Sequence, residues 1–350
     1  MADIAALTRA ADVFSVISKQ VPSMLSTASL KRNSRWDHAP ILDRRGAPKL
    51  AAITERDIEG IFKPLTRYRY LPADYLHAFA GGSLDYLVNR LNLLAREPNR
   101  YVARPQQQRA NAAANHRRLI YELADKGWRM MQERGMTCER SRAPANFAHE
   151  LMTSELMVSF ELSARATGVR LITWSDILQS RSLPEETRRS PKPYNIPVTA
   201  SFDGTPQATH VAADGQPFGI ARSVDGAPVY FFCPGIEADC GTEPIDTSDF
   251  QRSSLFKKFV LYLAIGAQGI YRSHFGFPSF SIPFVTSNAV RLASMMKLLE
   301  RISGGAGSKM VLFKTFPAFT SFDKPRPPSG HMLTEEWQRV GHPPFNFLSS

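Results

Sequence analysis

The feature that most constrains this chain of 350 residues is a segment near its centre in which acidic residues flank apolar runs. An apolar run after Asp214, a turn over Ser223–Pro228 and a second apolar run ending at Glu237 and Asp239 predict a β-hairpin. Side chains alternate along a strand, so Glu237 and Asp239 are expected on one face, with Asp214 on the neighbouring strand. Carboxylates held together repel unless a cation or proton intervenes, and hard oxygen ligands suit Mg²⁺ or Mn²⁺. The segment therefore predicts a metal site formed by Asp214, Glu237 and Asp239, with Mg²⁺ as its cofactor.

Length and composition indicate a globular protein of one large or two smaller domains. Hydrophobic residues make up 43% of the chain and charged residues 21%, and no apolar stretch approaches the roughly 20 residues of a membrane span. Cys138, Cys233 and Cys240 form no CxxC pair, which argues against a disulfide scaffold or zinc site and favours the cytoplasm. We expect no membrane partner.

The net charge of +11 is unevenly distributed along the chain. Residues 1–150 hold 24 Lys and Arg against 15 Asp and Glu, whereas residues 201–250 hold 1 against 8. A basic half supplies affinity for phosphates, and an acidic segment favours a metal site or a solvated loop. The alternative is that the basic charge serves solubility alone.

Residues 1–50 are predicted to form a basic arm. An amphipathic helix is expected over residues 3–21, followed by a turn-rich stretch over residues 26–48. The arm either follows a DNA backbone or is a basic tail without a function. Its basic residues are Lys31, Arg32, Arg35, Arg44 and Arg45.

Residues 51–105 show the clearest local organisation. Helices are predicted over residues 54–70, 72–79 and 83–94, with Thr54 and Ser83 as N-caps and Gly81 as a stop. Residues 96–104 resemble a tight turn between two short strands. This order is typical of a winged helix-turn-helix domain, in which the third helix enters the major groove.

The third predicted helix and the wing supply the candidate contacts to duplex DNA. Tyr86, Asn89, Arg90 and Arg96 are expected at base edges or phosphates, and Arg100 and Arg104 on the wing. The alternative is a winged helix that only docks another protein.

The remainder predicts a second, α/β domain over residues 147–315, reached through a helical linker over residues 106–146. A strong helix begins near His149 and ends at Gly168, and helices and strands alternate beyond it. Glu150, Glu155 and Glu161 are expected on a solvated helix face; the alternative is that one of them, Glu150 or Glu155, turns toward the metal site. Scattered histidines, His149 among them, show no metal-ligand spacing. The proline-rich tail over residues 316–350 is expected to cover the surface.

Three stretches together resemble the replication-relaxation family of bacterial plasmid and mobile-element proteins. They are Ala51–Arg104, Phe147–Leu156 with its Phe-Ala-His-Glu-Leu-Met-Thr-Ser-Glu-Leu sequence, and Phe231–Glu243 with Glu-Ala-Asp-Cys-Gly-Thr-Glu at its end. The resemblance covers roughly residues 50–315. It implies a mixed α/β fold, with a winged-helix DNA-binding domain followed by a domain similar to PD-(D/E)xK nucleases.

The resemblance makes Asp214 the first metal-binding acid and Glu237 the second. The chain departs from the pattern two residues later, where Asp239 stands in place of a lysine, and also at Ala213, where the pattern has proline. Lys257 or Lys258 is expected to supply the missing cation from the following helix.

These observations predict a DNA-binding protein of a plasmid or mobile element, whose nuclease-like domain cleaves or nicks DNA with Mg²⁺. The catalytic residues would be Asp214, Glu237, Lys257 and Lys258. The alternative is a non-catalytic transcription or replication regulator whose second domain makes protein contacts, including those of a homodimer.

Overall fold

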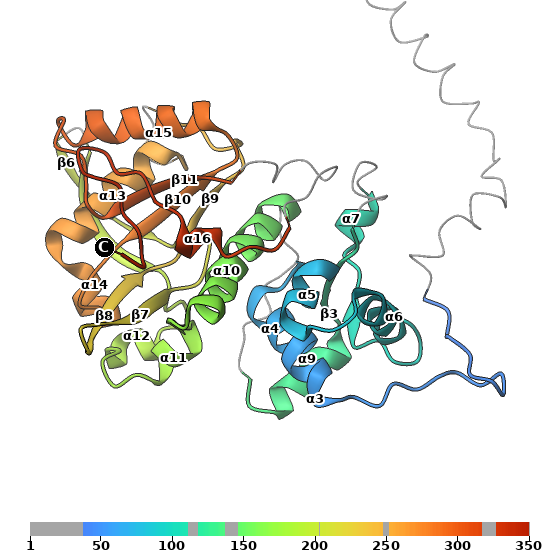
Figure 1. Cartoon of the computed structure of the whole chain (residues 1–350). Coiled ribbons are helices and arrows are strands. Elements are labelled where there is room, and N and C mark those ends of the chain that lie inside the picture. Colours follow the sequence, from blue (N-terminus) through green and yellow to red (C-terminus); the bar gives the residue numbers. More distant parts are fainter. Residues whose placement is uncertain are drawn as a thin grey trace, which may run out of the picture. The chain divides into compact units, whose positions relative to one another are not determined.

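The computed structural model describes residues 38–110, 118–136, 146–202, 204–247, 252–316 and 327–349 (Figure 1). Nearly all of them belong to the compact unit formed by residues 40–350, which has a mixed α/β fold with several small sheets. The helix expected over residues 3–21 and the basic residues Lys31, Arg32 and Arg35 lie outside the described residues. Arg44 and Arg45 are exposed, beside an isolated bridge between Leu42 and Pro48.

The predicted helices of the N-terminal part are confirmed. Thr54 caps the first helix through a capping box with Asp57, and Ser83 caps the third by accepting from the amide of Tyr86. Gly81 ends the second helix with a positive φ of 65°. The first helix is continuous through a π-helical turn, so the elements in order are α3 (Glu55–Asp57), η3 (Ile58–Phe62), α4 (Lys63–Tyr68), β1 (Leu71–Pro72), α5 (Ala73–Ala80) and α6 (Leu84–Ala95).

The strands near this part differ from the prediction. The turn expected between two strands over residues 96–104 contains only β2 (Val102–Ala103). Its partner is β3 (Ile120–Leu123), which lies in the region predicted to be helical and forms an antiparallel sheet in the order β1-β3-β2. A strand of only four residues, here Ile-Tyr-Glu-Leu, is too short for its period to distinguish it from a helix, so the interpretation as helix was wrong there. Along the chain, helix α7 (Gln106–Ala110) comes before β3 and helix α9 (Asp125–Glu133) comes after it.

Helix α10 (Phe147–Thr167) contacts both the N-terminal helices and the C-terminal strands. It begins at the cap Asn146 and ends at Gly168, as expected. The prediction of a solvated face is wrong, because Glu155 is 4% exposed and Glu161 6%. Glu161 accepts from Arg67 and Tyr68 of α4, and these contacts offset the cost of burying its charge.

The acidic segment is divided between two sheets. Strands β7 (Phe218–Val224) and β8 (Ala227–Cys233) form the predicted hairpin around the positive-φ turn Asp225–Gly226, and β4 (Arg170–Ile172) joins them in the order β4-β7-β8. Glu237 and Asp239 do not end this hairpin, because they lie on a separate strand, β9 (Glu237–Asp239).

Strand β9 pairs in parallel with β10 (Ile282–Thr286), which pairs in parallel with β11 (Val311–Thr315). Parallel strands require a crossover, and α15 (Ala289–Ile302) supplies it between β10 and β11. A second apolar core forms between this sheet, its helices and the hairpin β5–β6. The remaining elements are β5 (Ile196–Phe202), β6 (Thr205–Val211), α11 (Trp174–Gln179), α12 (Glu185–Arg189), α13 (Leu255–Gln268), α14 (Ile270–Phe275) and α16 (His331–Thr334).

The C-terminal tail is part of the core and not a surface cover. Trp337 and Phe347 are fully buried, and Phe345 is 7% exposed. Trp337 stacks on Phe160 of α10 with ring centroids 6.1 Å apart. Gln338 forms an isolated antiparallel β-bridge with Phe313 of β11. The prediction failed because the tail's prolines indicate an irregular backbone, which can still carry aromatic anchors. Within the described residues no helix is long and apolar enough to cross a membrane.

Candidate functional site

Asp214 and Glu237 come from different segments that two loops bring together. Asp214 precedes β7, and its Oδ2 accepts from the amide of Ala238 at 2.9 Å. The amide of Gly215 donates to Ile236 O at 3.0 Å. Gly235 has a φ of +147°, and a Cβ there would lie 2.2 Å from the Gly215 carbonyl oxygen. The close approach of the two loops therefore requires glycine at this position.

Lys258 lies between the two carboxylates. Its Nζ is 2.7 Å from Glu237 Oε2, 3.9 Å from Asp214 Oδ2 and 3.1 Å from Glu243 Oε2. The side chain is in the first turn of α13, which Ser254 caps. Tyr262, one turn further along the same helix, donates to Glu237 Oε1. Of the two lysines expected to supply the cation, the structure places Lys258 at the carboxylates.

Burial and charge set the protonation of this cluster. Burial alone would raise the pKa of Asp214, but the hydrogen bond from His149 and the Lys258 charge lower it to about 2. Burial raises the pKa of Glu237 to about 8, against the opposing effect of Lys258. Burial tends to lower the pKa of Lys258, but the three carboxylates raise it above its usual value. At neutral pH Lys258 is therefore positive and Asp214 negative, whereas burial favours the protonated form of Glu237.

Helix α10 contributes His149 to the cluster. Its Nε2 lies 3.1 Å from Asp214 Oδ2, and its pKa is raised, first by the hydrogen bond to Asp214. Neither acid expected to turn toward the site does so. Glu150 lies 3.9 Å from Arg69, and the buried Glu155 has its pKa raised to about 8 by burial, which the charge of Arg118 only partly offsets.

Asp239 forms an ion pair with Arg291 rather than with Lys258. It shares a strand face with Glu237, as alternation predicts, but its carboxylate is bound by Arg291 from α15 through two nitrogens, one at 2.7 Å. Thr286 Oγ1 also donates to it at 2.9 Å. With Asp239 4% and Arg291 14% exposed at the side chain, this is a buried ion pair. The structure therefore separates Asp239 from Asp214 and Glu237.

The donors at the cluster fit a divalent cation in part. Asp214 and Glu237 offer carboxylate oxygens, and Mg²⁺ is commonly held by one or two carboxylates completed by waters and substrate phosphates. Within the described residues, however, no group of three or more His, Cys, Asp and Glu side chains is arranged to hold a metal ion. The assignment of Mg²⁺ to Asp214 and Glu237 stays a prediction.

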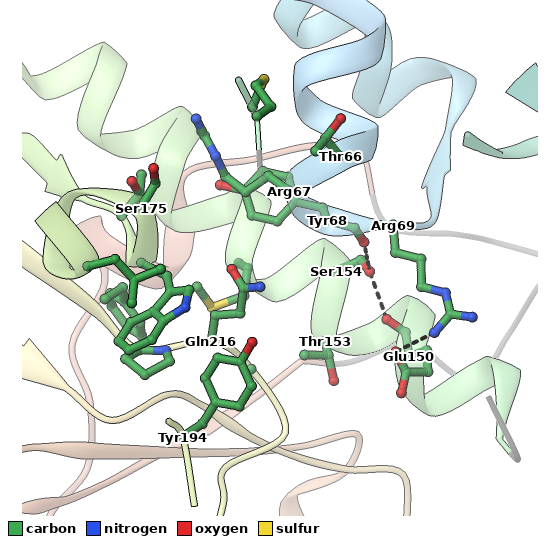
Figure 2. A pocket seen from close by; sticks show the side chains of 18 of the residues that line it. Thr66, Arg67, Tyr68, Arg69, Glu150, Thr153, Ser154, Ser175, Tyr194 and Gln216 are labelled. Atoms are coloured by element: carbon green, nitrogen blue, oxygen red, sulfur yellow. Dashed lines mark hydrogen bonds and ion pairs between the residues drawn. The ribbon is translucent and has the colours of Figure 1, made fainter. Parts of the chain in front are cut away.

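A cavity of about 1330 Å³ opens beside Asp214. Figure 2 shows its wall where Ser154 of α10 hydrogen-bonds the Tyr68 and Glu150 carbonyl oxygens and Arg69 faces the Glu150 carboxylate. The charged lining residues are nearly balanced in sign: Arg67, Arg69, Arg188, Glu122, Glu150, Asp176 and Asp214. The cavity gives Asp214 access from solvent but does not by itself indicate the charge of a ligand.

The predicted DNA-contacting residues of α6 divide into two groups. Tyr86 and Asn89 are exposed. Arg90 instead forms an ion pair with Asp57, with Nη2 2.6 Å from Oδ2 and Nε 2.8 Å from Oδ1, and its Nη2 also donates to Ala52 O at 2.5 Å. Arg90 therefore joins α6 to the first helix, which corrects its expected place at the DNA.

The three arginines beyond α6 also differ from one another. Arg96 is half-buried at the end of α6, and Arg100 is exposed and lies 3.0 Å from Glu97. Arg104, expected on the wing, is 5% exposed and donates to Asn92. Because β2 pairs with β3, the connection between paired strands runs from Arg104 to Leu119 and not over residues 96–104.

Sequence reasoning missed three members of the cluster: His149, Glu243 and Tyr262. Tyr262 lies four residues after Lys258 on one helix, so helical spacing pointed to it once Lys258 was chosen. His149 had no such signal, because it reaches Asp214 from a helix 65 positions earlier in the chain. No protein-family model matches this chain, and no match was found among curated proteins or solved structures.

Proposed function

We propose that this chain is a DNA-binding protein in which a winged helix reads duplex DNA and a nuclease-like site cleaves or nicks it with Mg²⁺. The observation that carries the proposal is the position of Lys258 between Asp214 and Glu237. A cation beside two carboxyl groups, of which Asp214 lines a solvent-accessible cavity, is a set of charges that suits phosphodiester hydrolysis.

Support for the winged helix comes from the order and pairing of the N-terminal elements. This part of the chain contains three helices, with one strand after the first helix and two strands after the third. The three strands form an antiparallel sheet in the order β1-β3-β2. In that arrangement α6 is the helix that enters the major groove. The excess of basic residues over residues 1–150 supplies phosphate affinity.

In the proposed site Asp214 and Glu237 would hold the ion, which would supply the chemistry of lowering the pKa of a bound water. The ammonium group of Lys258 faces the negative charge that develops on the scissile phosphate. His149 and the amide of Ala238 fix the Asp214 carboxylate by hydrogen bonds to Oδ2. Asp239 takes no part, because Arg291 occupies both of its oxygens.

The competing function is a transcription or replication regulator that binds DNA without cutting it. Its supporting observation is that Lys258 lies within ion-pair distance of both carboxyl groups, where its charge offsets part of theirs without any metal ion. In that case the second domain would make protein contacts, such as those of a homodimer.

The test is to incubate the purified chain with supercoiled and linear DNA in Mg²⁺, Mn²⁺ or a chelator. Metal-dependent nicking should disappear in Asp214→Ala and fall by about 10²- to 10³-fold in Lys258→Met, since losing one charge-stabilising group costs that much. DNA retardation should persist in both variants. The exposed Lys297 on α15 provides the matched control, Lys297→Met, which should cut normally.

Two results would change the conclusion. Retardation without cleavage by the wild-type chain under every metal condition would leave the regulator as the function. Absence of retardation would contradict DNA binding itself.

A further inference from the structure

The exposed surface of α6 has an unusual composition for a helix that binds DNA. The residues exposed on its first two turns are Leu84, Asp85, Tyr86 and Asn89. None of these is basic. Tyr86 is 58% exposed and offers a ring edge and a hydroxyl group, and Asn89 offers an amide that both donates and accepts.

Arg90 is the only Lys or Arg in α6, and it is held inside the fold. Its guanidinium binds both oxygens of Asp57 and the Ala52 carbonyl oxygen, and the side chain is 14% exposed. Releasing it toward DNA would leave Asp57 buried without its cation, which is costly. Arginine and lysine are the residues that contact guanine O6 and N7 in the major groove. The helix therefore lacks a side chain that is free to read guanine.

Tyr86 is held in place by a residue of the first helix. The Arg56 guanidinium lies 5.3 Å from the Tyr86 ring centroid. Arg56 is itself fixed at the turn before α6, where its Nε donates to Ala80 O at 3.2 Å and its Nη2 to Gly81 O. A side chain whose orientation is set before binding loses little entropy on binding. The Arg56 contact therefore favours one orientation of the Tyr86 side chain.

From these observations we infer that α6 reads A·T base pairs, with Asn89 contacting adenine and Tyr86 contacting the thymine methyl group, and makes no direct contact with guanine. The inference rests on the proposed winged helix and specifies its target. An amide pairs with adenine N6 and N7, and apolar groups contact the thymine methyl. Affinity for phosphates comes from elsewhere, including the exposed Arg100 and Arg129, because phosphate contacts position a protein without specifying sequence.

The test is selection of bound sequences from a randomised duplex library, followed by anisotropy titrations at one fixed salt concentration. A·T pairs should be enriched. Asn89→Ala should weaken binding to the selected duplex by about 5- to 150-fold, the range of one bidentate base contact, and leave binding to a scrambled duplex unchanged. Replacing the contacted thymine by uracil, which lacks the methyl group, should weaken the wild type and not Tyr86→Ala.

Tyr230→Ala is the matched control, because Tyr230 is 44% exposed on β8, far along the chain from α6. It should bind both duplexes as the wild type does. Enrichment of G·C pairs at positions whose preference disappears in Asn89→Ala would overturn the inference and leave DNA binding intact. Equal binding of selected and scrambled duplexes would also overturn it. Failure of the wild type to bind any duplex would overturn the proposed function as well.

Discussion

Replacing Arg291 by methionine should destabilise the protein strongly, because it leaves a buried carboxylate without its cation. Asp239 is 4% exposed and accepts from Arg291 through both of its oxygens, so the remaining donors are Thr286 Oγ1 at 2.9 Å and the Gly241 amide at 3.2 Å. Removing one partner of a buried pair costs about 3–5 kcal/mol. The same variant also removes the donor to Glu243 O.

The second variant separates charge from packing. In the double variant Arg291→Met with Asp239→Asn, the buried group is neutral, so most of the loss should be recovered, leaving a deficit of about 1–2 kcal/mol from lost hydrogen bonds. The matched control is Arg301→Met on the same helix. Arg301 pairs with Asp246, but the side chains are 61% and 47% exposed, and exposed pairs contribute about 0–1 kcal/mol.

The assay is urea unfolding followed by tryptophan fluorescence and circular dichroism, with free energies from linear extrapolation. The reasoning is refuted if Arg291→Met costs no more than Arg301→Met. It is also refuted if Asp239→Asn adds its own loss to that of Arg291→Met instead of offsetting it. Either result would make Asp239 available for the metal site that the sequence alone predicts.

Three further predictions test other buried groups. Burial raises the pKa of Glu155 to about 8 from 4.5, against the opposing charge of Arg118, so the folded chain keeps a proton that the unfolded chain releases. Stability should therefore fall by up to about 1.4 kcal/mol per pH unit as pH rises between those values, and Glu155→Gln should flatten the fall when unfolding is measured at about pH 5 and pH 8. Tyr68→Phe removes a buried donor to the Glu161 carboxylate and should cost about 1.5–3 kcal/mol in urea unfolding; no loss would mean that Arg67 and Arg165 satisfy this acid without it. Trp337→Ala should cost about 3–5 kcal/mol, and a near-neutral result would contradict the burial of the tail in the core.

The sequence predicted what depends on a few neighbouring residues. The caps at Thr54 and Ser83, the stop at Gly81 and the turn at Asp225–Gly226 follow from local hydrogen bonding and backbone freedom. The pairing of β2 with β3 did not follow, because the two strands are two and four residues long and have no periodic pattern to distinguish them from a turn and a helix.

The chemistry of the site was predicted only where the residues share an element. The face shared by Glu237 and Asp239 followed from strand alternation, whereas the sequence left Lys257 and Lys258 as alternatives and only the structure places Lys258 beside Glu237. The sequence did not show that Asp239 forms an ion pair with Arg291, because Arg291 is 52 positions away in the chain. Spacing along a strand gives the direction of a side chain, but the fold decides which cation it meets.

Helix α10 joins the first helix to the candidate site. Glu161 on this helix binds Arg67 and Tyr68 of α4, and His149 on the same helix reaches Asp214. The two positions are twelve residues apart, which corresponds to about 18 Å along a helix. Because a continuous helix that is largely buried bends little over that length, the contacts at one end fix where the other end lies. The placement of the candidate site relative to the first helix therefore depends on the Glu161 contacts together with the hydrogen bond from Ser154 to the Tyr68 carbonyl oxygen. In the proposed function, Tyr68→Phe should then alter the distance along the DNA between the bound sequence and the position of cleavage. This should hold even where the variant still binds DNA and still cleaves it.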